Sequence, residues 1–497
     1  MPVKKTSVLA NDLVGEPTQV EKTEINSAVS SDTISTDAID MKDAMEEKEI
    51  LMDKQENNQQ APLQESALVQ VLAPESTQDS QNYQTSQNNQ PNQNNRSGQG
   101  SSSYAPRITR HKVMRGNFQE EDTSSEVIEG ILDMSRDGHG ILRVGYSESE
   151  RDAYISTSQI RRLQLRPGDV VTGPARKPKD NERFWGLLKV DKVNDIPVDE
   201  FARKDRVKFK SLTPVYPDSQ LKMETGKEPL SLRIVDMIAP IGKGQRSLIV
   251  SPPKAGKTTL LKDIATGVAA NNPEIHLMAV LVGERPEEVT DIRRHIDHLT
   301  KGRGEVAASN FDEPATDQCR VAELALERAK RLVEAGQDVV ILLDSITRLA
   351  RAYNLAMPTS GRTLSGGFDP AALFPPKKFF GAARNFEVQG SLTIVGTALV
   401  DTGSRMDDLV YEEFKGTGNQ EIHLDRGLAE RRIHPSIDVQ KSGTRRDDLL
   451  IDPVTYQAVI TLHRMLDMLG KDERTITLIE KLKRTDSNKD FLASLKG

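Results

Sequence analysis

A short stretch between residues 250 and 261, VSPPKAGKTTLL, limits what this chain can fold into more than any other part of it. It follows the apolar run RSLIV and precedes the amphipathic run LLKDIATGVA, so it predicts a strand, a loop and a helix that begins at Lys257. In such a loop the backbone N–H groups and the helix N-terminus point at phosphates. The stretch therefore predicts a nucleotide site, although Ser251 stands where the usual pattern has its first glycine.

Each residue type in this loop has an expected role. Ser251 is acceptable if the strand end keeps an ordinary backbone conformation, because glycine is needed only where φ is positive or a Cβ would collide. We expect crowding to be greatest at Gly256, immediately before Lys257. Lys257 is expected to reach the β- and γ-phosphates and Thr258 to hold Mg²⁺. ATP and Mg²⁺ are thus the expected ligands.

From residue 230 to 497 apolar runs alternate with amphipathic ones. The runs SLIVS, HLMAVLV, DVVILLD and SLTIVGTALV are uninterrupted, which is typical of parallel strands covered on both faces. Helices are expected from Lys257, after Pro286, near residues 316–335 and up to about Ala356, with several more between 446 and 496 outside the sheet. The sequence predicts an α/β domain with a mainly parallel sheet.

Two carboxylates follow predicted strands. Asp344 closes DVVILLD, and Glu284 follows HLMAVLVG. Ligands bind at the carboxyl ends of strands in such sheets, so Asp344 is expected in the Mg²⁺ shell and Glu284 beside the attacking water. Either residue alone could simply cap a helix. Together, behind a phosphate loop, they predict an ATPase.

Residues 124–197 have a different pattern. Five short apolar runs are separated by Gly, Pro, Asp and Asn, and each predicts a strand: EVIEGILDM, GILRV, DAYISTSQI (152–160), DVVTGPAR and FWGLLKVDKV. This spacing predicts a small closed barrel of the oligonucleotide-binding (OB) type, followed by a linker at 198–229. Between residues 161 and 190 there are 8 Lys and Arg against 3 Asp and Glu, with Phe184 and Trp185 among them. Such charge favours RNA phosphates and such rings stack on bases, although barrel core is the preferred interpretation for Trp185 and an alternative for Tyr154.

The net charge of −7 is concentrated at the start of the chain, where residues 1–100 hold 7 Lys and Arg against 16 Asp and Glu. Residues 1–123 are expected to be a disordered acidic, then Gln/Asn-rich, tail; residues 41–52 could form a transient helix or stay solvated. We expect no leader and no membrane span, and the single cysteine, Cys319, excludes an internal disulfide. A cytoplasmic protein is expected.

Several longer blocks carry a resemblance: GKGQRSLIVSPPKAGKTTLL, GERPEEVTD, LLDSITRLARAYN, FFGAARN, DTGSRMDDLVYEEFKGTGN and SGTRRDDLL. From about residue 125 to 497 the chain resembles the Rho family of bacterial transcription termination factors, which are ring-shaped, RNA-dependent ATPases with a RecA-like core. The family's phosphate loop also lacks the first glycine. The resemblance implies a homohexamer that binds nascent single-stranded RNA, translocates as a helicase and releases RNA from the RNA polymerase elongation complex, with an elongation factor of the NusG type as a further partner.

The resemblance also implies residue roles at the nucleotide. Glu284 would be the catalytic acid, and Arg445 an arginine finger that enters a neighbouring subunit's site, with Arg432 at the same interface. His434 stands where the family commonly stacks an aromatic ring on adenine, which leaves adenine specificity open. The implied ATP-binding residues are Gly242, Lys243, Gly244, Gln245, Arg246, Ser247, Lys254, Ala255, Gly256, Lys257, Thr258, Thr259, Arg285, Arg432 and His434.

Two RNA surfaces are implied in the same way. His139 and Ile141 replace a pair of aromatic residues of the family, so the preference for pyrimidines is in doubt. The implied primary site comprises Gly138, His139, Gly140, Ile141, Leu142, Arg143, Asp152, Ala153, Tyr154, Glu182, Arg183 and Phe184. Loops at 359–369 and 401–408 match the family's channel loops, with contacts expected at Arg362, Thr363, Ser365 and Arg405.

Two other functions remain open at this point. GER after a strand and DSITRLA also resemble rotary and export-type ATPases, which have no use for the basic barrel or the loop at 359–369. A non-catalytic RNA-binding protein would require an inactive nucleotide site. Turnover with and without RNA separates the three.

Overall fold

A computed structural model describes residues 125–135, 137–388 and 390–495 of the 497-residue chain. All of these residues lie in one compact unit. The predicted tail at 1–123, including the segment 41–52, lies outside the described residues. No described helix combines the length and the apolar character that a bilayer span requires. Cys319 is a free, buried thiol.

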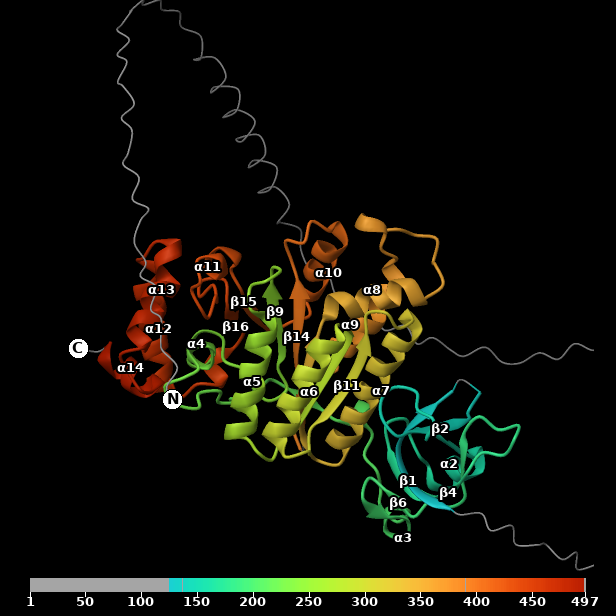
Figure 1. Cartoon of the computed structure of the whole chain (residues 1–497). Coiled ribbons are helices and arrows are strands. Elements are labelled where there is room, and N and C mark those ends of the chain that lie inside the picture. Colours follow the sequence, from blue (N-terminus) through green and yellow to red (C-terminus); the bar gives the residue numbers. More distant parts are fainter. Residues whose placement is uncertain (1–124, 136, 389, 496–497) are drawn as a thin grey trace, which may run out of the picture. The chain divides into compact units, whose positions relative to one another are not determined.

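The first part of the described chain is a small barrel (Figure 1). Its strands follow the order β1-β2-β3-β5-β4-β6-β7, and a further pairing of β1 with β4 closes the first five, which confirms the predicted OB-like barrel. The strands are β1 (Glu126–Met134), β2 (Gly140–Arg143), β3 (Ala153–Ile155), β4 (Val170–Arg176), β5 (Trp185–Leu187), β6 (Lys192–Val193) and β7 (Ile196–Pro197). Trp185 is buried among the apolar residues of the barrel, as expected.

The prediction for one of the barrel strands is wrong in its second half. The run at 152–160 leaves the sheet after Ile155 and becomes helix α2 (Thr157–Leu163). Ser156 and Gln159 form a capping box: the Ser156 hydroxyl accepts from the Gln159 N–H at 3.3 Å, and the Gln159 side chain accepts from the Ser156 N–H at 3.1 Å. Helix formation buries Ile160 in the barrel core, so an apolar residue that fits strand alternation serves a helix face instead.

The second part is the predicted α/β domain. Its strands run β11-β10-β12-β14-β9-β15-β16, and every neighbouring pair from β11 to β15 is parallel. The strands of this path are β9 (Arg246–Ser251), β10 (His276–Glu284), β11 (Glu305–Asn310), β12 (Asp338–Asp344), β14 (Ser391–Leu399), β15 (Gln420–His423) and β16 (Gly443–Thr444). The mainly parallel sheet is therefore confirmed.

Helices cover both faces of this sheet, as the uninterrupted apolar strands predict. Along β10, Leu277 and Leu281 belong to one apolar cluster and Met278 and Val282 to the other. The helices that contribute to the first cluster are α4 (Leu230–Ile238), α5 (Lys257–Asn271), α6 (Pro286–Thr300), α12 (Pro453–Asp467), α13 (Lys471–Leu482) and α14 (Asn488–Ser494). Those of the second are α7 (Ala315–Glu334), α8 (Ile346–Ala356), α9 (Phe374–Phe380) and α10 (Arg405–Lys415).

The segment between the two parts contributes to both of them. Helix α3 (Val198–Phe201) buries Phe201 in the barrel core. Further along, β8 (Pro214–Val215) pairs with β13 (Arg384–Phe386), which itself pairs with β14 of the core sheet. Short helical turns fill three other connections, at η3 (Ser365–Gly367), η4 (Pro370–Leu373) and η5 (Asp447–Leu449), and α11 (Arg426–Glu430) follows β15.

Candidate functional site

The phosphate loop connects β9 to α5 at the carboxyl edge of the sheet. Gly256 has a φ of +95°, yet a Cβ built on it meets no heavy atom within 4 Å. The expected crowding at Gly256 is therefore wrong, and glycine is required there by the left-handed backbone conformation instead. Ser251 is buried and is not among the residues with positive φ, so a serine at the first position is tolerated, as expected.

Lys257 lies between the two predicted carboxylates. Its Nζ is 2.6 Å from Asp344 Oδ1 and 3.4 Å from Glu284 Oε1. Burial lowers the pKa of Lys257, but the charges of Asp344 and Glu284 outweigh burial and raise it overall. The carboxyl ends of β10 and β12 thus bring together, beside the phosphate loop, the three residues that the sequence predicts to act on ATP.

Glu284 is buried and has a second cationic neighbour. Arg348 Nε lies 3.1 Å from Glu284 Oε1, and its Nη1 donates to the Gly283 carbonyl at 2.6 Å. Burial and the charge of Asp344 raise the pKa of Glu284, while Lys257 and Arg348 oppose this shift. A carboxyl group with a raised pKa is suited to accept a proton near neutral pH. Arg348 is a residue that the sequence interpretation missed, although it lies in the DSITRLA block.

The donor atoms at this point fit Mg²⁺. Asp344 Oδ1 is bound by Lys257 and by the Thr397 hydroxyl at 2.8 Å, whereas Oδ2 is buried without a hydrogen-bond partner among the described residues. The described part of the chain has no cluster of three His, Cys, Asp or Glu side chains that could hold a metal unaided. Asp344, the Thr258 hydroxyl and nucleotide phosphates together make the kind of oxygen set that Mg²⁺ takes.

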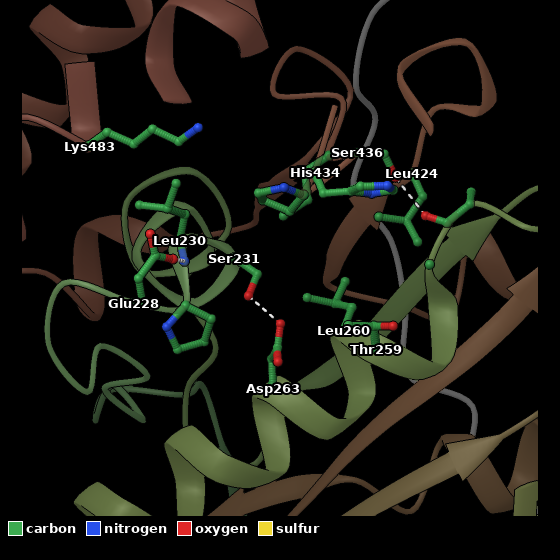
Figure 2. Close-up of a pocket in the computed structure, with 15 residues that line it drawn as sticks. Glu228, Leu230, Ser231, Thr259, Leu260, Asp263, Leu424, His434, Ser436 and Lys483 are labelled. Carbon is green, nitrogen blue, oxygen red and sulfur yellow. Dashed lines mark hydrogen bonds between the residues drawn. The ribbon is translucent and has the colours of Figure 1, made fainter. Parts of the chain in front are cut away.

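A pocket of about 440 Å³ opens beside the phosphate loop (Figure 2). Ala255, Gly256 and Thr259 line it together with His434, so it brings those predicted ATP residues together. The Ser436 hydroxyl donates to the Ala255 carbonyl at 2.6 Å. This hydrogen bond connects the segment that carries His434 to the phosphate loop. Other lining residues, which no sequence motif indicated, are Glu228, Ser231, Asp263 and Lys483.

The predicted residues Gly242–Ser247 lie elsewhere, at the opposite edge of the sheet, where β9 and β12 begin. Lys243 Nζ is 2.7 Å from Asp338 at the start of β12, and the Gly244 N–H donates to the Thr393 hydroxyl at 2.8 Å. Ser247 is fully buried and donates to Gln420. This stretch does not line the pocket at the chain's own phosphate loop.

The remaining predicted arginines are exposed. Arg285 follows Glu284 and lies 3.3 Å from Glu288. Arg432 has a φ of +61°. The Arg445 N–H donates to the Asn419 carbonyl at 2.9 Å, and Asn419 in turn binds the start of β9 through Arg246. Arg445 thus lies with Gly242–Ser247 and away from Lys257.

On the barrel, β2, β3 and the segments just before β2 and β5 present part of the predicted RNA set to solvent. Tyr154 is 38% exposed, pairs with Ile141 and Gly186 across the sheet, and has its hydroxyl 3.1 Å from His139 Nδ1. The Arg183 guanidinium lies 5.2 Å from the centre of the Phe184 ring. Tyr154 is exposed and Phe184 partly buried, and together with these cations they give the barrel a surface of the kind on which single strands stack.

Glu182 on this surface is held by a residue that the sequence interpretation did not single out. Arg176 Nη1 and Nη2 lie 2.6 and 2.7 Å from its two carboxylate oxygens. The hydrogen bond from Arg176 and the one from the Lys179 N–H lower the pKa of Glu182 to about 2. Glu182 is therefore ionised and held in place by Arg176.

Other members of the predicted RNA set are interior. Leu142 and Ala153 are fully buried, as is Asp152. Arg143 is 2% exposed and binds Asp152 at 2.6 Å and Asp133 at 3.3 Å. This buried ion pair joins the end of β2 to the start of β3. Direct contact of Arg143 with RNA would require its side chain to leave Asp152 and move to the surface.

The two predicted channel loops lie against each other. A Cβ on Gly366 would come within 2.7 Å of the Met406 backbone nitrogen, so the first loop rests on the first turn of α10. Arg362, Thr363 and Ser365 are exposed, and so is Arg405 at the start of α10. The structure thus brings Ser365 close to the start of α10, where Arg405 lies, while Arg362 and Thr363 share the exposed loop of Ser365.

Comparison with known proteins agrees with both parts. The model of the ATP synthase alpha/beta family, nucleotide-binding domain, matches residues 231–444, and the model of the Rho termination factor, RNA-binding domain, matches residues 128–199. Transcription termination factor Rho of Bacillus subtilis (strain 168) is 53% identical over 395 residues, which cover 78% of this chain and 90% of that protein. Rho of Pseudomonas fluorescens biotype C is 52% identical over 375 residues, covering 74% and 87%. The chain belongs to the transcription termination factor Rho family.

Proposed function

We propose that this chain is an RNA-dependent ATPase and helicase that binds nascent RNA, moves along it by hydrolysing ATP and ends transcription by releasing RNA from RNA polymerase. The observation that carries this proposal is the combination, in one chain, of a Rho RNA-binding domain with a phosphate loop whose Lys257 lies 2.6 Å from Asp344 and 3.4 Å from Glu284. ATP synthase-type domains alone would leave the barrel unexplained.

ATP binding would rearrange the charges around Lys257. A triphosphate carries more negative charge than the two carboxylates that hold Lys257 here, so it draws this ammonium group onto its β- and γ-phosphates. Asp344 is then free to hold Mg²⁺ together with Thr258, and the ion supplies charge neutralisation at the phosphate oxygens. When Lys257 moves to the phosphates, its ion pair with Glu284 is also broken. Glu284 then orients the attacking water and accepts its proton.

Arg445, which the family resemblance assigns to the γ-phosphate, is not part of the centre around Lys257. Arg445 is exposed and lies at the far edge of the sheet, so within one chain it cannot reach the phosphates. A second copy of the chain can bring it there, which supports a ring of identical subunits, a homohexamer, with Arg445 and Arg432 acting on the neighbour's nucleotide. Hydrolysis then depends on assembly.

RNA would be held at two surfaces with different roles. The barrel surface around Tyr154 and Phe184 captures the strand by stacking. The two contacting loops that carry Arg362 and Arg405 would bind the RNA strand during translocation, because ATP hydrolysis can change the positions of these loops. We place the protein in the cytoplasm, where nascent RNA, the RNA polymerase elongation complex and an elongation factor of the NusG type would be its partners.

The proposal is tested by ATP turnover of the full-length protein with and without single-stranded RNA of differing base composition. Turnover that rises strongly with RNA is the expected result. A rotary or export-type ATPase would hydrolyse ATP at the same rate in both cases, and a non-catalytic RNA-binding protein would show no turnover that Lys257→Ala removes. Either of these outcomes would contradict the proposed function.

Loss of the Phe184 ring should weaken RNA capture without harming the ATPase centre. Phe184→Ala is expected to lower the affinity for RNA roughly 5- to 100-fold, because one base loses its stacking partner. Turnover at saturating RNA should stay near that of the unchanged protein. Fluorescence anisotropy of a labelled RNA measures the affinity, with Leu188→Ala as the control because it shortens another exposed apolar side chain of the barrel. Unchanged affinity would move the primary site elsewhere.

A further inference from the structure

Three arginines gather at the edge of the core sheet where the parallel strands begin. Arg246 is the first residue of β9 and pairs with Ile394 of β14. Arg384 of β13 pairs with Leu392, two residues earlier on the same edge of β14 as β9, because β12 takes the opposite edge. Arg445 is bound through Asn419, which accepts from the Arg445 N–H at 2.9 Å and from the Arg246 N–H at 2.9 Å. Three separate elements thus bring three guanidinium groups to one place.

Among the described residues, this cluster has no counter-ion. Arg246 is partly buried, and its guanidinium donates only to carbonyls, those of Thr417 at 2.8 Å and Ala383 at 3.2 Å. Neither it nor Arg384 nor Arg445 has an ion pair with a carboxylate of the described residues. Burial lowers the pKa of Arg246, and the charges of Arg384 and Arg445 lower it further, with no acidic group to oppose them. One partly buried cation with two exposed cations beside it, and no carboxylate of the described residues paired with any of them, favours an anionic ligand.

The anion must come from another molecule. Five residue steps of β9, at about 3.3 Å each, separate Arg246 from Ser251 by roughly 16 Å, so a nucleotide in the chain's own phosphate loop lies at the opposite edge of the sheet. The channel loops also follow the carboxyl ends of their strands, because α10 comes after β14. RNA gripped there is likewise remote from the cluster.

We propose that Arg246, Arg384 and Arg445 form one anion-binding site that receives the triphosphate bound in the phosphate loop of a second copy of this chain. This inference rests on the proposed function, in which Arg445 acts on a neighbour's nucleotide, and extends it to Arg384, a residue with no role until now. It also accounts for Gly242–Ser247, which pack beside the cluster: a Cβ on Gly244 would come within 2.5 Å of the Arg384 carbonyl carbon. These residues meet the neighbour's nucleotide and not their own.

Arg384 is the residue to change, because it is exposed and, among the described residues, its side chain makes one long hydrogen bond, to the Gly381 carbonyl at 3.3 Å. Arg384→Gln is expected to reduce kcat for ATP about 10- to 100-fold, as for the loss of one charge-assisted hydrogen bond. Arg446→Gln is the matched control, since Arg446 is adjacent to the cluster but already pairs with Asp448 at 3.0 Å. Its kcat should change less than twofold.

Co-assembly shows which copy Arg384 serves. Lys257→Ala disables the phosphate loop but keeps the cluster, so assemblies co-expressed from Lys257→Ala and Arg384→Gln chains contain sites that join an intact loop to an intact cluster. We expect turnover well above the sum of the two variants alone. Absence of this recovery, or an Arg384→Gln defect confined to RNA affinity, overturns the inference.

A parallel mixture of Lys257→Ala with Arg445→Ala separates this inference from the proposed function. Recovery with Arg445→Ala but not with Arg384→Gln would leave the proposed function intact and remove Arg384 from the site. Failure of both mixtures would contradict hydrolysis across subunits altogether. Size measurement of each mixture establishes that both chains enter one assembly.

Discussion

Glu284→Gln is expected to lower the rate of ATP hydrolysis about 10²- to 10⁴-fold while ATP still binds. The amide keeps the shape of the side chain but cannot accept a proton from water. Lys257 and the phosphate loop, which hold the triphosphate, are unchanged. The substitution removes the ion pair between Lys257 and Glu284, so Lys257 gives up less when it binds the phosphates. The affinity for ATP should therefore be equal to or higher than that of the unchanged protein.

This result is measured in two ways on the same preparation, as phosphate release in the presence of RNA and as equilibrium binding of ATP. Glu287→Gln makes the same exchange three residues later, at an exposed position in the first turn of α6, and should leave both quantities as they were. Thermal unfolding of both variants tests whether the loss of activity comes instead from lower stability after the ion pair with Arg348 is removed. Equal turnover in Glu284→Gln would remove this residue from its role.

The centre around Lys257 was predictable because its parts are local in sequence or follow a general rule. A strand, a loop and a helix in succession define the phosphate loop, and the carboxyl ends of parallel strands converge, so Glu284 and Asp344 had to lie near it. The reason for Gly256 was not predictable in detail. Crowding and positive φ select the same residue, and only the backbone distinguishes them.

Other features depend on contacts between distant segments, which leave no pattern in one sequence. The pocket beside the loop joins Glu228, Asp263, His434 and Lys483 from four parts of the chain. In the barrel, a run that alternates like a strand turned into a helix at Ser156, because a capping box outweighed the alternation.

The roles implied by family resemblance needed the structure for a different reason. For Gly242–Ser247, resemblance says that the residues matter but not on which side of the molecule they act. They were grouped with Lys257 as nucleotide residues, yet they lie at the opposite edge of the sheet, together with Arg445, which the resemblance assigns to a neighbouring subunit's site. A single sheet cannot present both edges to one nucleotide, and this separation is the strongest physical argument for a site shared between two copies.

Arg445→Ala should have the largest effect among these variants apart from loss of the phosphate loop itself, a reduction in turnover of about 10³- to 10⁵-fold. A guanidinium stabilises the charge that develops on the γ-phosphoryl oxygens, which is greater in the transition state than in bound ATP. ATP affinity should thus change far less than kcat. Arg445→Lys keeps the charge but not the planar fork of donors, so it is expected to restore only a part of the rate.

Dilution distinguishes an arginine that acts across subunits from one that acts within a chain. If Arg445 completes a neighbour's site, turnover per chain of the unchanged protein falls as dilution separates the subunits, and the Arg445→Ala protein shows no such dependence because its sites are incomplete at every concentration. If Arg445 acted within its own chain, turnover per chain would be constant on dilution and the variant would be impaired to the same degree throughout. Phosphate release measured over a concentration series, with assembly followed by light scattering, therefore decides whether the far edge of the sheet belongs to the active centre of the next copy.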